Sequence, residues 1–389
     1  MKFAPISDRL TGLGAAKWAV HVEALRRQNA GESITMLSIG EPDLPPPASV
    51  LDRAAESMRS GRTRYAAGQG EPAALEAIAA HLARRSGTAV STDEVLYTAG
   101  TQNGLCTCLM TLVHPGDEVL VPDPYYATYE GLVAASGATF VPVPTTPEDR
   151  FHVTAESIER RITPNSRVLL LNTPSNPTGG VIPGPEIERL LAGLAAFPDC
   201  AILSDEVYSR ILYGEHQHVS LLTYPEIRDR LIVIDGWSKT YAMTGWRIGY
   251  GIWPEALFPH AERLAVNSWS CVNAATQWAA VAALEGPQDD VFTMVRAFDE
   301  RREVIVRELN AIPGIRCADP GGAFYVFPNI EGTGMTSAQF AHRFLEEAYV
   351  ATIAGTSFGA MGEGYIRISY AASMEEITEA MQRLRAFVG

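Results

Sequence analysis

The sequence has few cysteines, no long apolar run and a deficit of positive charge. The five cysteines are odd in number and none belongs to a Cys-x-x-Cys pair, so neither a disulfide framework nor a zinc site is expected, and a reducing cytoplasm fits this usage. No stretch approaches the roughly 18 apolar residues of a membrane span, and the opening MKFAPISDRL lacks the apolar segment of a secretory signal. We therefore expect a cytoplasmic protein that does not cross a membrane.

The charge balance is acidic, with 31 Lys and Arg against 45 Asp and Glu and a formal net charge of −14. Nucleic acids and anionic lipids need a concentrated positive surface, so neither is an expected partner. The 389 residues, 47% of them hydrophobic, can bury a large core and suggest two or three units of roughly 150 residues each.

Short apolar runs rich in β-branched residues alternate with helical patterns through the middle of the chain. Runs of this length, bounded by Gly, Pro, Asn or Asp, are typical of buried parallel strands. A helical pattern over 72–85 begins with proline and is followed by Gly87. This alternation predicts an α/β unit. The expected strands are 94–99, 118–122, 139–143, 167–172, 201–205 and 231–235.

The C-terminal third has a different pattern, which predicts an α+β unit. A long amphipathic helix is expected over 291–312, strands over 322–329 and 364–371, and a last helix that opens with a capping box of Ser373 and Glu376. Gly286 and Pro287 mark the boundary before this unit. We expect an N-terminal arm and part of the small domain over 1–45, a large domain over 46–288, and the rest of the small domain over 289–389.

Two cations in the stretch WSKTYAMTGWRIGY, Lys239 and Arg247, have no acidic residue near them in the sequence. Ligands bind outside the carboxyl ends of strands in an open parallel sheet, and Lys239 follows such an end. Another strand end is followed by Gly100, Thr101 and Gln102, which open a helix whose N-terminus suits a phosphate. Arg247 would then bind that phosphate in place of a carboxylate.

Asp205 also ends a strand, where a buried carboxylate needs a cationic partner or N–H donors. Lys239 in an apolar pocket would have a lowered pKa and offer a neutral amine as a nucleophile. An amine nucleophile, a buried carboxylate and a phosphate-binding arginine are what pyridoxal 5′-phosphate requires: a Schiff-base lysine, a partner for the ring nitrogen and an anchor for the phosphate.

Nine stretches, in order along nearly the whole chain, resemble the fold-type I, pyridoxal-phosphate-dependent aminotransferases of class I/II. The resemblance implies a large domain with a mainly parallel seven-stranded sheet sandwiched by helices, and a smaller α+β domain. The stretches are SIGEPDLP (38–45), TRYAAGQGEPAALEAI (63–78), TAGTQNGL (98–105), VPDPYYATYEG (121–131), LNTPSNPTGG (171–180), LSDEVYSRI (203–211), SKTYAMTGWRIGY (238–250), GGAFYVFP (321–328) and YIRISYA (365–371).

The same resemblance implies a role for each matching residue. Lys239 would carry the cofactor as a Schiff base and shuttle the substrate proton, and Asp205 would pair with the ring nitrogen. Tyr208 and Asn176 would hydrogen-bond the phenolic oxygen of the ring, and Tyr126 would stack on the ring. The phosphate would be held by Gly100, Thr101, Gln102, Ser238 and Arg247.

The substrate site and the partner subunit also follow from the resemblance. Arg367 would bind the substrate α-carboxylate, with Asn176 beside it and Gly40 leaving room. Tyr65 would reach the phosphate of a neighbouring subunit, which implies a homodimer with shared active sites. Two positions depart from the pattern. Gly236 stands where many relatives have serine, and Arg263 is the only arginine of the stretch 262–286 in which dicarboxylate-specific relatives place one.

These residues predict a ping-pong aminotransferase that acts on an amino acid and a 2-oxo acid. The stretch AAKWAVHVEALRR (15–27) resembles a branch that includes arginine–pyruvate aminotransferases; aromatic, alanine and branched-chain donors stay open, and aspartate is disfavoured. Two alternatives remain. One is a carbon–sulfur β-lyase on the same scaffold. The other is an effector-sensing domain without enzymatic activity, which is disfavoured because we expect no space for a DNA-binding helix-turn-helix ahead of the catalytic fold.

Overall fold

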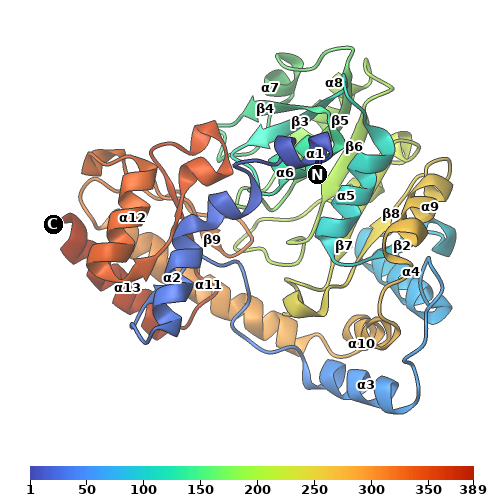
Figure 1. Cartoon of the computed structure of the whole chain (residues 1–389), viewed down its shortest axis with the longest axis horizontal. Helices are drawn as coiled ribbons and strands as arrows, with labels where there is room; N and C mark the ends of the chain where they lie inside the picture. Colours follow the sequence, from blue (N-terminus) through green and yellow to red (C-terminus); the bar gives the residue numbers. More distant parts are fainter.

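A seven-stranded sheet forms the centre of the protein, and a smaller group of helices and short strands lies beside it (Figure 1). The computed structural model describes residues 1–389 with the exception of the side chain of Ala15. Among the described helices, none combines the length and the apolar character that a bilayer crossing requires.

The large sheet has the strand order β2-β8-β7-β6-β5-β3-β4. Only β8 runs antiparallel to its neighbours, so the expected mainly parallel sheet is confirmed. β8 was missed in the sequence because GYGI has two glycines in four residues and does not form an apolar run. The strands are β2 (Val95–Thr98), β3 (Glu118–Asp123), β4 (Thr139–Pro144), β5 (Ser166–Asn172), β6 (Ala201–Asp205), β7 (Leu231–Gly236) and β8 (Gly249–Ile252).

Helices cover both faces of this sheet because successive strand residues point to opposite sides. In β5, Leu169 and Leu171 pack into one buried cluster, and Val168 and Leu170 pack into another. The first cluster includes residues of α3 (Ala48–Arg59), α4 (Pro72–Ser86), α7 (Ala155–Glu159), α8 (Gly184–Leu194) and α10 (Ala274–Glu285). The second includes residues of α5 (Thr101–Leu112), α6 (Tyr129–Ser136) and α9 (Phe258–Trp269).

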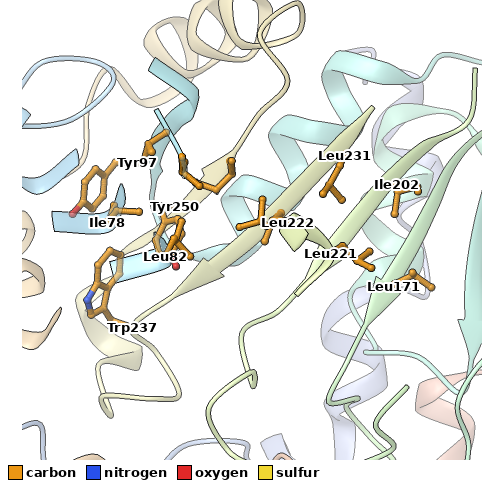
Figure 2. Close-up of a cluster of buried hydrophobic side chains, with 14 of the residues drawn as sticks. Ile78, Leu82, Tyr97, Leu171, Ile202, Leu221, Leu222, Leu231, Trp237 and Tyr250 are labelled. Carbon is orange, nitrogen blue, oxygen red and sulfur yellow. The ribbon is translucent and has the colours of Figure 1, made fainter. Parts of the chain in front are cut away.

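Figure 2 shows part of the first cluster, with Leu171, Ile202 and Leu231 on the neighbouring strands β5, β6 and β7. The expected helix over 72–85 is α4, and Gly87 ends it with a left-handed φ of 70°. Glycine adopts this conformation without the steric cost that a side chain would add.

The smaller unit contains α11 (Asp289–Asn310), which begins just after Gly286 and Pro287 as expected. Its other elements are α2 (Ala19–Asn29), α12 (Ser337–Ala348), α13 (Met374–Val388), β1 (Thr35–Met36), β9 (Tyr325–Val326), β10 (Val350–Ala351), β11 (Ile353–Ala354) and β12 (Ile366–Ser369). The capping box of Ser373 and Glu376 at the start of α13 is confirmed. The short α1 (Pro5–Arg9) instead lies against α6, beside the large sheet (Figure 1).

Two strands are shorter than the sequence indicates. Only Tyr325–Val326 of the expected strand 322–329 is a strand, since Ala323 has a φ of 59° and Pro328 has no N–H to donate. The expected strand 364–371 is reduced to Ile366–Ser369, and Gly364 before it has a φ of 82°.

We propose to keep the expected domain boundaries of 1–45, 46–288 and 289–389. The core of the smaller unit supports them, because it draws on Leu37 and on residues from 294 to 384. A segment of the large unit that includes Val207, Tyr208, Ile211 and Tyr213 packs into the same core, so the two units share an apolar contact.

Candidate active site

A cavity of about 410 Å³ opens at the carboxyl ends of the parallel strands, where the smaller unit meets the sheet. Most of the residues predicted for the site lie on its wall. Those that line it are Gly40, Thr101, Gln102, Tyr126, Asn176, Asp205, Tyr208, Ser238, Lys239, Arg247 and Arg367. Neighbouring strands bring them together; Asn172 pairs with Asp205 in the register of β5 and β6.

Lys239 lies three residues beyond the end of β7, in a turn that is anchored by Trp237. The indole of Trp237 is buried, stacks on Tyr97 with ring centres 5.7 Å apart, and donates its N–H to the carbonyl oxygen of Ala280 at 3.1 Å. The Nζ atom of Lys239 donates a hydrogen bond of 2.6 Å to the carbonyl oxygen of Gly40.

Burial first, and then the positive charge of Arg367, lower the pKa of Lys239 from 10.5 to about 8. The negative charges of Glu41 and Asp205 oppose this change. About half of such amines are neutral near pH 8, so Lys239 has the nucleophilic form that the sequence predicted.

Asp205 is the last residue of β6 and only 4% exposed. The hydroxyl of Tyr129 donates to its Oδ2 at 2.7 Å, and the N–H of Val207 donates to its Oδ1 at 3.3 Å. Burial raises the pKa of Asp205 to about 6, although these two hydrogen bonds act in the opposite direction. A cation placed against this carboxylate would favour its ionised form.

A site for an anion lies where β2 meets α5. Gly100 caps the N-terminus of α5 with a φ of 81°, and a Cβ atom there would lie 2.5 Å from Nη2 of Arg247. Arg247 donates to the carbonyl oxygens of Thr244 at 2.8 Å and Ala99 at 3.4 Å. In the described part of the chain no carboxylate lies within 4.0 Å of its guanidinium. Free N–H groups at a helix start and an unneutralised arginine suit a phosphate.

Arg367 is 1% exposed, although its place in a short strand gives no sign of burial. Its guanidinium donates to Oδ1 of Asn176 at 3.1 Å and to the carbonyl oxygen of Ser38 at 2.5 Å. Rings surround it, with centres at 5.3 Å for Trp18, 4.6 Å for Tyr325 and 4.7 Å for Phe358. No carboxylate among the described residues pairs with it, so this buried cation suits an anionic group of a ligand.

Position 40 requires glycine even in the free protein, because a side chain there would collide with a neighbouring residue. A Cβ atom at this position would overlap the phenol oxygen of Tyr325, whose hydroxyl lies 2.8 Å from that of Tyr208. Close contact also explains Gly236, which pairs with Gly249 between β7 and β8. A Cβ atom at 236 would lie 3.0 Å from backbone atoms of 248 and 249, so a serine there would need a shift of the backbone.

Four of the residues considered in the sequence do not line the cavity: Gly100 and Gly236, described above, and Tyr65 and Arg263. Tyr65 is 92% exposed, on the segment between α3 and α4. Arg263 is exposed on α9 and does not line the cavity.

Sequence reasoning missed several residues of the wall. Tyr129 lies inside the quoted stretch 121–131 and Tyr325 inside 321–328, so the motifs contained them without indicating their contacts. Glu41 lies inside the quoted stretch 38–45, and Trp18 and His21 lie inside 15–27, but neither stretch indicated a role for them in the cavity. The other unpredicted members of the wall are Ile39, Leu105, Asn172, Val207 and Thr244.

Fold and cavity together define an α/β enzyme with a nucleophilic lysine at the carboxyl edge of its sheet. The model of the family described as aminotransferase class I and II matches residues 32–384. The arginine–pyruvate transaminase of Pseudomonas aeruginosa is 38% identical over 384 residues, which cover 99% of this chain and 97% of the relative. An aspartate aminotransferase of Geobacillus stearothermophilus is 36% identical over 380 residues, with 96% of each chain covered.

The solved structures agree with this assignment. The crystal structure of the aspartate aminotransferase from Rhizobium meliloti matches with a TM-score of 0.95 at 33% identity, covering 100% of this chain and 99% of that one. The chain belongs to the aminotransferase class I and II family. It is therefore an aminotransferase of fold type I whose cofactor is pyridoxal phosphate. The lysine, the buried carboxylate and the anion site fit this cofactor.

Proposed function

We propose that Lys239 binds the cofactor covalently and that the protein exchanges amino groups between an amino acid and a 2-oxo acid by a ping-pong mechanism. The observation that carries this proposal is the convergence of three cations, Lys239, Arg247 and Arg367, on one cavity whose deepest carboxylate is Asp205. Each cation then has a separate partner: the aldehyde carbon, the phosphate and the substrate carboxylate.

The remaining residues would orient the cofactor. Arg247 holds the phosphate together with the N-terminus of α5, at Gly100, Thr101 and Gln102, and with the hydroxyl of Ser238. Asp205 would keep the ring nitrogen protonated. The positive charge of a pyridinium beside Asp205 favours the ionised form of its carboxylate, and that carboxylate in turn stabilises the pyridinium. Tyr126 packs against the ring, and Tyr208 and Asn176 donate to the phenolic oxygen.

Bound pyridoxal phosphate supplies an electron sink for the pair released when the substrate loses its α proton. Arg367 holds the substrate carboxylate, which places the α carbon near Nζ of Lys239. Once free of the cofactor, Lys239 removes that proton as a general base and returns it as a general acid. The pKa of about 8 suits both directions of transfer near neutral pH.

The lysine assignment has a sharp chemical test, because Lys2, Lys17 and Lys239 are the only lysines of the chain. Borohydride reduction of the holoenzyme followed by peptide mass spectrometry should place the cofactor mass on the peptide that contains Lys239. Lys239→Ala should retain part of the cofactor binding and lose turnover, and Lys2→Ala should behave as the wild type. Cofactor mass on another lysine, or normal transamination by Lys239→Ala, would contradict the proposal.

We further propose a homodimer in which Tyr65 contacts the phosphate bound by the partner. An aromatic side chain that is 92% exposed in the single chain supports this role. Mixing inactive Lys239→Ala with a weakened Tyr65→Phe should form hybrid dimers with one intact site, and should restore activity above the sum of the two. Purely additive activity would contradict shared sites.

The reaction class is tested by mixing the holoenzyme with single amino acids and following the absorbance of the cofactor. Arginine, aromatic, alanine and branched-chain amino acids are the candidate donors. Stoichiometric conversion of the cofactor supports amino transfer. Release of pyruvate and ammonia from cystathionine would instead support the carbon–sulfur β-lyase, which the family relatives do not favour.

A further inference from the structure

One charge of the cavity has no counterpart among the groups assigned so far. The cavity is lined by the cations Lys239, Arg247 and Arg367 and by the carboxylates Asp205 and Glu41. The proposed function, on which this inference rests, gives a partner to each of the three cations and to Asp205. Glu41 alone is left over.

Glu41 is close to the place where the substrate would react. It follows Gly40, whose carbonyl oxygen accepts the hydrogen bond from Nζ of Lys239, and its charge acts on that amine. Its Oε1 accepts a hydrogen bond from the hydroxyl of Thr244, which fixes the carboxylate at the mouth of the cavity. Ile39, 43% exposed, offers an apolar surface on the same segment.

A second carboxylate on the substrate would have no cation left to pair with, because the proposed function assigns Arg247, which bonds Thr244 beside Glu41, to the phosphate and Arg367 to the first carboxylate. The only histidine that the described part of the chain places on the cavity wall is His21, whose Nδ1 lies 2.9 Å from Oγ of Ser38. Burial and the charge of Arg367 lower the pKa of His21 below 6.5, which leaves it neutral at pH 7. With those cations already paired, an anionic side chain placed beside Glu41 would meet its negative charge without a free cation to offset it.

We infer that Glu41 determines substrate specificity and that it selects an amino donor with a cationic side chain. The donor's alkyl stem would lie against Ile39, and its guanidinium or ammonium would pair with the carboxylate of Glu41. Because Glu41 is exposed in the free protein, solvent screens the pair, and we expect a preference of about fivefold to tenfold over a neutral donor of the same shape.

Arginine and citrulline are a matched pair for the test, since citrulline replaces the guanidinium by a neutral urea group of the same size. In the wild type, kcat/KM for the half-reaction should be about fivefold to tenfold higher with arginine, and the ratio should fall as salt screens the charge. Glu41→Gln retains an oxygen for Thr244 and should bring the ratio close to one. General damage to the site would lower kcat/KM for both donors alike, so the ratio measured on one variant is not affected by it.

Controls separate charge from shape. Glu41→Asp retains the charge and should keep part of the preference. Glu255→Gln removes an exposed carboxylate outside the cavity wall and should leave the ratio unchanged. Calorimetry with 5-guanidinopentanoate and 5-ureidopentanoate, which lack the reactive amino group, should show the same preference in binding affinity.

The outcomes distinguish this inference from the proposed function. If amino acids convert the cofactor but arginine and citrulline react equally in the wild type, the role of Glu41 is wrong and the aminotransferase mechanism stands. Faster conversion of glutamate or aspartate than of arginine would overturn the inference in the same way. If no amino acid converts the cofactor at all, the proposed function itself fails.

Discussion

The lowered pKa of Lys239 predicts an unusually reactive amine in the protein stripped of its cofactor. The change from 10.5 to about 8 corresponds to about 3 kcal/mol in favour of the neutral form. At pH 8 about half of the Lys239 side chains would be neutral, against about 0.3% for an ordinary lysine.

Competitive acetylation with trace acetic anhydride measures this directly. The rate of labelling of the Lys239 peptide, taken relative to a reference peptide amine at each pH, should rise with a midpoint near pH 8. Arg367→Met should move the midpoint upward, because a positive charge that destabilises the ammonium is removed, yet not as far as 10.5, because burial remains the larger cause. Arg263→Met, a change outside the cavity wall, should not move it. A wild-type midpoint above pH 10 would refute the reasoning.

The same group makes stability depend on pH. Between pH 8 and 10.5 the unfolded chain still binds the proton that the folded chain has released, so the free energy of unfolding gains from this residue as pH rises. Below pH 8 the full cost of about 3 kcal/mol remains. Tyrosines titrate at these pH values too, so the wild type is compared with Lys239→Met, in which the tyrosines are unchanged. The variant should have the higher free energy of unfolding at pH 8, and this difference should shrink as the pH rises to 10.5. A difference that is constant with pH would contradict a buried, titrating amine.

Three other substitutions test the supports of the site. Trp237→Ala should lower the free energy of unfolding in urea by about 3–5 kcal/mol, because it removes a buried aromatic ring. Tyr129→Phe removes a hydrogen-bond donor to Asp205, so the pKa of Asp205 should rise above about 6. The pH below which the cofactor no longer binds, measured by fluorescence titration, should then shift upward by about one unit. Gly249→Ala places a Cβ atom 2.8 Å from the backbone nitrogen of Thr101, and should cost about 1–3 kcal/mol of stability and weaken cofactor binding in calorimetry.

The sequence was sufficient to predict which strand ends form the site. Buried parallel strands form continuous apolar runs, so the polar residues that follow them, such as Asp205 and Lys239, are conspicuous. Parallel connectivity places the carboxyl ends of these strands on one edge, and this explains why residues 34 positions apart line one cavity.

Contacts between distant segments could not be predicted in this way. Tyr129 bonds Asp205 across 76 positions, and Tyr208 meets Tyr325 across 117. The burial of Arg367 was also hidden, because all four residues of β12 are buried and an alternating pattern therefore carries no information about its faces.

Three cations share this cavity with two carboxylates, Asp205 and Glu41, and among the described residues neither carboxylate forms an ion pair with any of them, so their mutual repulsion is a cost to the free protein. Lys239 responds with a pKa lowered to about 8, whereas a guanidinium group offers no comparable release of a proton. A ligand that brings a phosphate to one and a carboxylate to the other removes this cost in the folded state only, and so stabilises the fold by mass action. The cofactor should therefore raise the melting temperature of the wild type, and less so that of Arg247→Met, in which the phosphate loses its cation. Equal increases in both would mean that Arg247 does not hold the phosphate, and its missing carboxylate partner would need another explanation.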